Sequence, residues 1–122
     1  MKNPISTFAW NDLQLDDWLI PQENILEGQP DASGLIIYMT NDKTSCSGIW
    51  QCKPGKFRWD YTWNESIYII SGRGKIFEES GAIHELSPGK MVHFNPGLKS
   101  TWVVEELIQK FFALQSEVEL QL

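Results

Sequence analysis

The amino-acid sequence predicts an all-β protein that folds as a small jelly-roll barrel. Short runs rich in β-branched and aromatic residues recur along the chain, from LIIYM at residues 35–39 to LIQKFFAL at residues 107–114. Turn-forming residues separate these runs at intervals of roughly 8 to 12 residues, a spacing typical of β-sandwiches and barrels. A chain with about nine such strands has many edges to protect, and a double-sheet jelly roll or a closed barrel protects them.

Length and composition favour one globular domain. The chain has 122 residues, of which 42% are hydrophobic and 21% are charged, as in ordinary globular proteins. We expect a single domain over residues 1–122, with an N-terminal arm at 1–30 and a barrel at 31–116. Residues 117–122 alternate polar and apolar side chains, which predicts a C-terminal strand or tail.

The local signals place the elements in order. Residues 11–18 predict about two helical turns, with Leu15 and Trp18 on one side. Further along, the Pro-Gly pairs at 54–55, 88–89 and 96–97 each suit the middle of a type II turn, because proline presets φ and glycine accepts a positive φ. The Gly72-Arg73-Gly74 segment lacks the strand-loop-helix setting of a phosphate cradle, so it predicts a turn between strands.

Charge and hydropathy limit the classes of partner that the chain is expected to bind. The net charge of -6 and the scattered basic residues argue against nucleic-acid binding. No apolar run approaches the roughly 20 residues that cross a bilayer, so no membrane association is expected. The start of the sequence lacks a secretory h-region, which favours a cytoplasmic location. In that compartment Cys46 and Cys52 are expected to be free thiols packed as small apolar groups.

Several motifs together resemble the cupin superfamily, and in particular the subgroup that contains the cupin domain of (S)-ureidoglycine aminohydrolase. The resemblance begins near ILEGQP at residue 25, continues through GIWQCKPGKFRWDYTWNESIYIISG, and resumes with SPGKMVHFNPGLKSTWVVEELIQKFFAL. It covers roughly three-quarters of the chain in the expected order and ends near Leu114. It implies a cupin jelly roll, or double-stranded β-helix.

The resemblance also implies a change at the metal site. Cupins hold a transition metal with three histidines and one glutamate inside the barrel. The histidine positions correspond here to Trp59, Tyr61 and Ser100, and only Glu65 matches the pattern. One carboxylate is too few for the usual site, so no metal or other cofactor is expected.

Strand alternation predicts what replaces the metal. Phe57, Trp59 and Tyr61 share one face of the FRWDY strand, and the motif register points that face into the barrel. The predicted lining is apolar with a few polar groups, as in a small-molecule pocket. The predicted ligand-binding residues are Trp59, Tyr61, Glu65, Ser100, Trp102 and Lys110.

Glu65 has two interpretations. It is either a general base or ligand anchor, or a structural partner of a buried cation, because an inward carboxylate is costly unpaired. The resemblance places a lysine at Lys110, which is the predicted partner. The aromatic residues likewise fit either core filling or pocket walls. His84 and His93 lie away from the cupin ligand positions and fit structural roles better than an unconventional metal site.

Three functions remain open on the sequence. The first is a metal-free cupin that binds a small polar metabolite in an aromatic barrel. The second is an enzyme, either ureidoglycine aminohydrolase-like or a simple isomerase or hydrolase, although no nucleophile motif supports a specific reaction. The third is a structural module, with a homodimer formed through the sheets, the N-terminal arm or the edge at 117–122.

Overall fold

The computed structural model describes residues 4–122, so the first three residues of the predicted arm lie outside the described part. It contains nine strands and two 3-10 helices of three residues each, which confirms the all-β prediction. In chain order the elements are η1 (Trp10–Asp12), β1 (Asp16–Asp17), η2 (Gln22–Asn24), β2 (Ile25–Gly28), β3 (Ala32–Met39), β4 (Ser45–Cys52), β5 (Gly55–Asp60), β6 (Asn64–Glu78), β7 (Ile83–Leu86), β8 (Met91–Phe94) and β9 (Lys99–Gln115).

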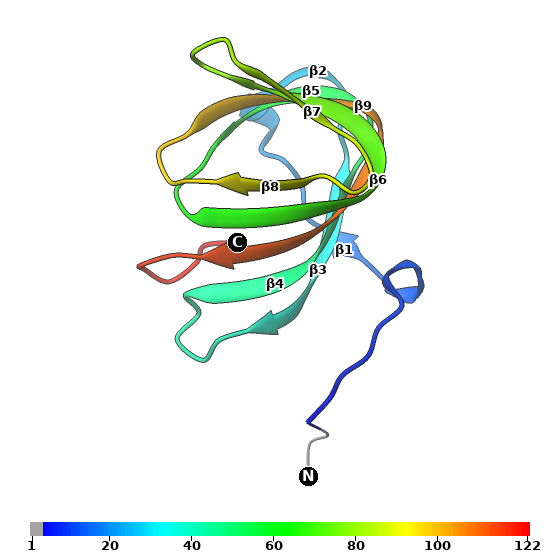
Figure 1. The fold of residues 1–122 in the computed structure, drawn as a ribbon, viewed down its shortest axis with the longest axis vertical. Coiled ribbons are helices and arrows are strands. Elements are labelled where there is room, and N and C mark those ends of the chain that lie inside the picture. Colours follow the sequence, from blue (N-terminus) through cyan, green and yellow to red (C-terminus); the bar gives the residue numbers. More distant parts are fainter. Residues whose placement is uncertain (1–3) are drawn as a thin grey trace.

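All the strands belong to one antiparallel sheet that curls into a barrel (Figure 1). The long strand β9 organises the sheet. One side of β9 pairs with β5 and then with β4, and the other side pairs with β6. At the margins, β6 also pairs with β7 and β8, β3 extends the sheet to β1, and β5 extends it to β2. β9 is therefore the central strand of the sheet, and β4, β5 and β6 all pair with it.

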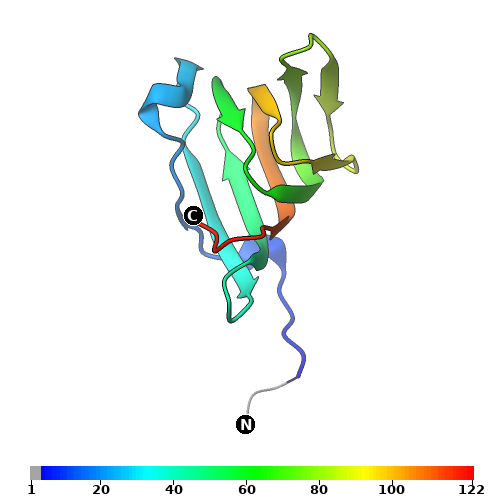
Figure 2. The same cartoon turned by 90° about the vertical axis from the view of Figure 1, so that its left-hand side faces the viewer.

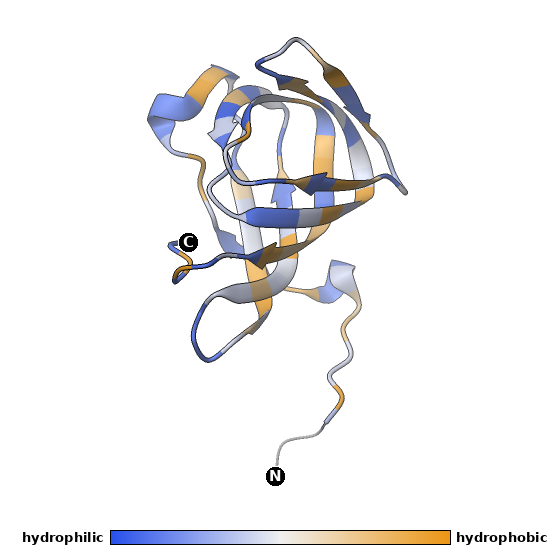
Figure 3. Cartoon of the chain, turned by 60° about the vertical axis from the view of Figure 1, so that its left-hand side comes forward, coloured by the Kyte–Doolittle hydropathy of each residue, from blue (hydrophilic) through white to orange (hydrophobic). Residues whose placement is uncertain are grey.

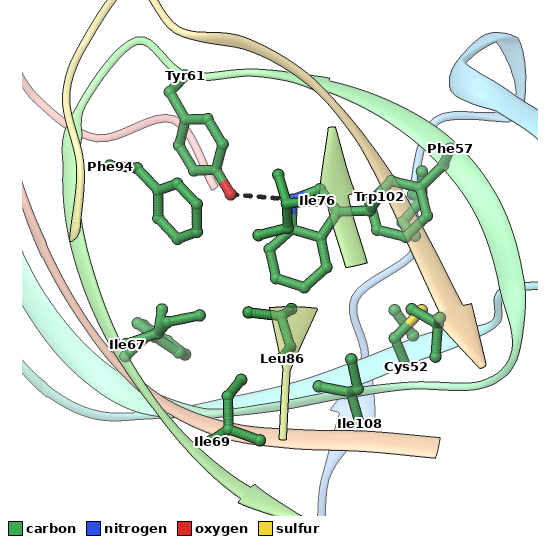
Figure 4. Close-up of a cluster of buried hydrophobic side chains, with 14 of the residues drawn as sticks. Cys52, Phe57, Tyr61, Ile67, Ile69, Ile76, Leu86, Phe94, Trp102 and Ile108 are labelled. Atoms are coloured by element: carbon green, nitrogen blue, oxygen red, sulfur yellow. Dashed lines mark hydrogen bonds between the residues drawn. The ribbon is translucent and has the colours of Figure 1, made fainter. Parts of the chain in front are cut away.

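Side-chain alternation fills that interior. Along β9 the even-numbered residues 100, 102, 104, 108, 110, 112 and 114 are buried. Hydrophobic and hydrophilic residues alternate along the strands of the barrel (Figure 3), as a sheet with one buried face requires. Inward residues of different strands, among them Phe57, Ile76 and Trp102, meet in one core (Figure 4).

Two pairs of predicted strands are fused. The runs SIYII and KIFE form the single strand β6, and STWVV and LIQKFFAL form β9, so the predicted turn at Gly72-Arg73-Gly74 is wrong. The glycines instead accommodate irregular pairing, because the β6–β9 register shifts three times between Ile69 and Gly74. Gly72 has φ +95, and a Cβ there would overlap the carbonyl oxygen of Leu107. Glycine therefore bends the strand without ending it.

We expect Gly72→Ala to destabilise the fold substantially more than Gly81→Ala does. Both glycines have a positive φ, near +95 and +99, so both variants incur the conformational cost of roughly 1 kcal/mol or more. Only Gly72 faces backbone within contact distance, whereas no atom lies within 4 Å of an added Cβ at Gly81. Urea unfolding of the two variants measures the difference, and equal losses would contradict the proposed steric origin.

The Pro-Gly turns follow the prediction at two of three positions. Gly89 and Gly97 have φ values of +91 and +94, and both turns are closed by backbone hydrogen bonds, from Lys90 N to Ser87 O and from Leu98 N to Asn95 O. The prediction is wrong at Gly55, which begins β5 without a positive φ. A Cβ at Gly55 would lie 2.7 Å from Pro30 Cδ, so glycine is needed there for close packing.

The predicted helix at residues 11–18 is also wrong. Only η1 forms there, and β1 follows it because Asp16 and Asp17 pair with β3. Trp18 extends this docking by donating its backbone N–H to the carbonyl of Ala32. Its ring reaches the sheet over Gly34, where a Cβ would lie 2.6 Å from Trp18 Cε3. Sheet pairing and this close approach outweigh weak helical propensity.

The two ends of the described chain behave differently. The first described residues run away from the barrel (Figures 1 and 2), and Ile5 and Phe8 are 77% and 51% exposed. Residues 117–122 form no strand, so that alternative for the C-terminal segment is wrong. Leu120 is instead buried, and its backbone N–H donates to the carbonyl of Lys43. Within residues 4–122, no helix has the length and apolar character that crossing a membrane would require.

Candidate functional site

The barrel contains a cavity of about 250 Å3, which we call the aromatic pocket. Its inner wall comes from four strands, β4, β5, β6 and β9. The remaining residues come from the loop between β5 and β6, from the segment between β1 and η2, and from the C-terminal segment. The lining residues are Trp18, Leu19, Ile20, Pro21, Trp50, Phe57, Trp59, Tyr61, Trp63, Glu65, Trp102, Lys110, Phe112, Leu114, Gln121 and Leu122. The wall is therefore mainly aromatic, with one acid and one base.

Strand register brings the charged residues together from distant parts of the sequence. Glu65 pairs with Leu114 across β6 and β9, and Lys110 pairs with Trp50 across β9 and β4. Since Lys110 and Leu114 lie four positions apart on β9, they share one face, and Lys110 and Glu65 therefore project from the same face of the curled sheet. Their side chains meet in the interior, where both residues are buried.

Glu65 and Lys110 form the buried ion pair that the sequence predicted as one alternative. Lys110 Nζ lies 2.7 Å from Glu65 Oε2, and the two side chains are only 8% and 6% exposed. The second carboxylate oxygen, Oε1, accepts a hydrogen bond of 3.0 Å from Trp63 Nε1. Each charge is therefore compensated, as burial demands.

Aromatic faces provide further contacts for the Lys110 ammonium. Nζ lies 4.6 Å from the ring centroid of Trp50 and 5.1 Å from that of Trp102. Both distances are within the range of cation–π attraction, which strengthens when the cation is desolvated. Lys110 thus occupies the position over these rings that an external cation would otherwise take.

Tyr61 and Trp102 form the neutral polar contact of the wall. The Trp102 indole Nε1 donates to the Tyr61 hydroxyl at 3.2 Å, as the dashed line in Figure 4 shows. Burial, reinforced by the negative charge of Glu65, raises the pKa of Tyr61 well above 10.0, and the Trp102 hydrogen bond lowers it in part. The phenol stays protonated at neutral pH.

The residues at the cupin ligand positions do not fit a transition metal. Both oxygens of Glu65 are engaged by Lys110 and Trp63, and the Tyr61 phenol is protonated. Ser100 Oγ donates to the carbonyl of Trp59 at 2.8 Å. Across residues 4–122, no three His, Cys, Asp or Glu side chains gather in a way that could hold a metal ion. The available donors offer an ammonium-bound carboxylate, which is a poor ligand set for a divalent cation.

The structure places five of the six predicted site residues in the pocket wall, namely Trp59, Tyr61, Glu65, Trp102 and Lys110. Ser100 is buried behind the wall, where its hydroxyl bonds to backbone. Each histidine has a partner outside the pocket. His84 Nε2 lies 2.6 Å from Glu78 Oε2, and His93 Nδ1 lies 2.8 Å from Ser66 Oγ.

Sequence reasoning missed Trp18, Trp50 and Trp63, together with the C-terminal Gln121 and Leu122. A signal existed for Trp63, because it lies two positions before Glu65 in the sequence and its indole N–H can reach that carboxylate. Trp50 needed the register with Lys110, and Trp18 needed the approach over Gly34. These contacts join residues that are far apart in the sequence, so no local sequence pattern predicts them.

Alkaline pH is expected to lower the free energy of unfolding between about pH 9 and pH 12. Burial raises the pKa of Cys46 to about 11 and that of Cys52 to about 12, from an ordinary value of 9.0. In this window the unfolded chain releases thiol protons that the folded chain retains, so stability falls as pH rises. Each thiol contributes a slope of up to about 1.4 kcal/mol per pH unit.

Urea unfolding at several pH values measures this slope. The variant Cys46→Ala/Cys52→Ala is the control, because it removes both thiols and leaves Tyr61 as a buried group with a raised pKa. Its stability should decline less steeply between pH 9 and pH 11 than that of the wild type. Identical slopes in the two proteins would show that the thiols are not responsible.

The sequence matches a known protein family, and the fold is similar to those of several solved structures. The family model of the EutQ-like cupin domain matches residues 39–112, which is more than half of the chain. No curated protein matches the sequence significantly. The solved structures below are all less than 25% identical to the chain, so their similarity shows the fold alone.

Three solved structures illustrate that similarity. The EutQ protein of Clostridium difficile has a TM-score of 0.72 at 15% identity, covering 92% of this chain and 87% of that chain. Ectoine synthase from P. lautus has a TM-score of 0.66 at 14% identity, covering 94% and 80%. The Cnp3 cupin domain of Schizosaccharomyces pombe has a TM-score of 0.68 at 7% identity, covering 91% and 74%. They confirm the predicted cupin jelly roll.

Proposed function

Because the chain belongs to the EutQ-like cupin family, we propose that it binds a small polar metabolite in the aromatic pocket without a catalytic metal. The observation that carries the proposal is the cavity of about 250 Å3, walled by aromatic rings and provided with the Glu65–Lys110 pair. An apolar concave site with a few placed polar groups is the usual form of a small-molecule site. The fold itself gives no ligand, since related cupins bear names as different as EutQ and ectoine synthase.

A ligand screen with a position-specific readout tests the proposal. Indole N–H signals in a two-dimensional 15N NMR spectrum report separately on the six tryptophans. A true pocket ligand should shift the signals of Trp59 and Trp63, which line the cavity, and spare Trp10, which lies outside it. Amines, ureides and organic acids are suitable library members.

Matched variants sharpen the test. Trp59→Ala removes part of the pocket wall and should weaken a bound ligand by roughly two- to tenfold, since an aromatic contact is worth roughly 0.5–1.5 kcal/mol beyond its buried area. Trp10→Ala, at a ring 38% exposed, should leave the affinity unchanged. A library that shifts no pocket indole, or a ligand equally affected by both variants, would contradict the proposal.

On the motifs named in the sequence, we propose that the chain shares its fold with the cupin domain of (S)-ureidoglycine aminohydrolase. The proposal concerns the fold alone. The manganese-dependent deamination of that enzyme is not proposed for this chain, because the donors at Trp59, Tyr61, Glu65 and Ser100 do not fit the metal. Elemental analysis of the purified protein, followed by an assay for ureidoglycine consumption with added Mn2+, tests this distinction. Metal-dependent turnover would restore the enzymatic alternative.

A homodimer is a second proposal, and exposed apolar residues favour it. Met91, Tyr68 and Phe111 form an outer stripe, because Tyr68 pairs in register with Met91 on β8 and with Phe111 on β9. They are 79%, 44% and 40% exposed. The N-terminal residues Ile5 and Phe8 are exposed too, and a two-fold axis would allow each chain to cover apolar residues of the other.

Light scattering at several concentrations tests the dimer. The wild type should show twice the mass of one chain, and Phe111→Lys should shift it to monomer. Tyr38→Lys is the matched control, since Tyr38 is 63% exposed on β3 and lies outside the stripe. A monomeric wild type, or equal effects of the two variants, would contradict the proposal.

A further inference from the structure

The charge balance of the aromatic pocket limits the class of ligand it accepts. Among the lining residues, Glu65 and Lys110 are the only charged side chains, and they neutralise each other at 2.7 Å. Their burial means that solvent screens them weakly. A ligand that enters the pocket therefore meets a satisfied ion pair, with no unpaired charge to attract it.

A charged ligand would have to compete with one member of the pair. An anion would need the Lys110 ammonium, and it would approach the Glu65 carboxylate that already holds it. A cation drawn to Glu65, or to the faces of Trp50 and Trp102, would have to displace Lys110, which already occupies both environments. Either competition leaves a buried charge without its partner, and the cost of that unpaired charge opposes binding.

A neutral ligand avoids this cost and still gains polar contacts. An ammonium has three N–H donors, and the structure pairs one of them with Glu65. A ligand carbonyl oxygen is able to accept another without disturbing the ion pair. The surrounding tryptophan rings favour a planar body that stacks on them.

The cavity volume sets the ligand's size. An apolar protein cavity of about 150 Å3 holds benzene, so about 250 Å3 accommodates one ring with a short polar substituent. Within the wall, the Phe57 and Trp102 rings are near-parallel, with an interplanar angle of 12°, whereas the Trp59 and Trp63 rings are tilted at 54°.

We infer that the pocket selects uncharged planar molecules carrying a carbonyl or amide group, and that the Glu65–Lys110 pair enforces this selection. This inference rests on the proposed binding function and adds the ligand's charge class. It also assigns a specificity-determining role to two residues that would otherwise serve stability alone. Removing one member should convert the preference to the charge of the removed group.

The test uses three ligands that share one ring, namely benzamide, benzoate and benzylamine. Titrations at pH 8, followed by the indole N–H shifts of Trp59 and Trp63, give their dissociation constants. For the wild type we expect benzamide to bind at least tenfold more tightly than either charged analogue. Tighter binding of benzoate or benzylamine, or no binding of benzamide, would overturn the inference.

Two single variants test the role of the pair. Glu65→Gln leaves the Lys110 ammonium unpaired, so benzoate should become the preferred ligand. Lys110→Met leaves Glu65 unpaired, so benzylamine should become preferred. The double variant Glu65→Gln/Lys110→Met contains neither charge and should bind the two charged analogues equally weakly. Folded single variants that keep the wild-type order would overturn the inference.

The outcomes separate this inference from the proposed function. If the wider library yields a charged ligand that shifts the pocket indoles, the binding function stands and the charge selection fails. If neither the library nor benzamide shifts them, both fail. Should a single variant not fold, as circular dichroism and dispersed NMR spectra would reveal, the wild-type order of the three ligands decides alone.

Discussion

Replacing Lys110 with methionine is expected to destabilise the folded protein by about 3–5 kcal/mol. Methionine fills a similar volume, so the loss comes from charge rather than from a cavity. The variant leaves Glu65, whose side chain is only 6% exposed, with Trp63 as its remaining partner. The Lys110 contacts with Trp50 and Trp102 disappear as well. Urea unfolding followed by tryptophan fluorescence measures the change.

The double variant Glu65→Gln/Lys110→Met is the control for this prediction. It removes both charges and retains side chains of similar size, and neutralising a buried pair often costs little or even stabilises. We therefore expect the double variant to be more stable than Lys110→Met alone, with a coupling energy of at least about 1 kcal/mol. Additive effects of the two substitutions would show that the residues do not act as a pair.

Replacing Trp102 with alanine is expected to cost about 3–5 kcal/mol, the range found for large aromatic residues in cores. Trp102 is 2% exposed and stacks on Phe57 at a centroid distance of 5.9 Å. Its ring also contacts Trp50 and Phe94 at 6.1 Å each. Alanine would leave a cavity among all three rings. It would also remove the hydrogen-bond donor of the Tyr61 hydroxyl. Chemical denaturation measures the loss.

Two variants separate the sources of that loss. Tyr61→Phe removes only the acceptor of the Trp102 hydrogen bond and should cost about 1 kcal/mol. Trp10→Ala removes a tryptophan that is 38% exposed and should cost less than Trp102→Ala by at least about 2 kcal/mol. If Tyr61→Phe were as damaging as Trp102→Ala, the hydrogen bond rather than ring packing would dominate.

The parts of the site that could be predicted from sequence lie within single strands or follow the cupin motifs. Alternation along FRWDY correctly placed Trp59 and Tyr61 toward the pocket, because a two-residue period leaves only two faces. The resemblance pointed to Lys110 as the partner of Glu65, and the structure confirms that ion pair. The cost of burying an unpaired charge also predicts this ion pair, because neither charge is stable alone inside a barrel.

The parts that could not be predicted depend on chain segments meeting across the fold. Gly72 resembles a turn residue in sequence, yet it permits the bend in β6 that lets β9 pair along its length. The sequence around Trp18 predicted a helix, but in the structure the backbone pairing of β1 with β3 places Trp18 over Gly34. Local propensity is weak in such cases, and tertiary contacts decide the outcome.

The position of the C-terminal segment has a practical consequence for experiments on this protein. Leu122 lines the pocket, while Glu119 and Leu120 are tethered to Lys43 by an ion pair of 3.8 Å and a backbone hydrogen bond. An affinity tag joined to Leu122 would emerge beside the cavity and obstruct titrations. A tag at the N-terminal end of the sequence leaves that region free, because the first described residues run away from the barrel.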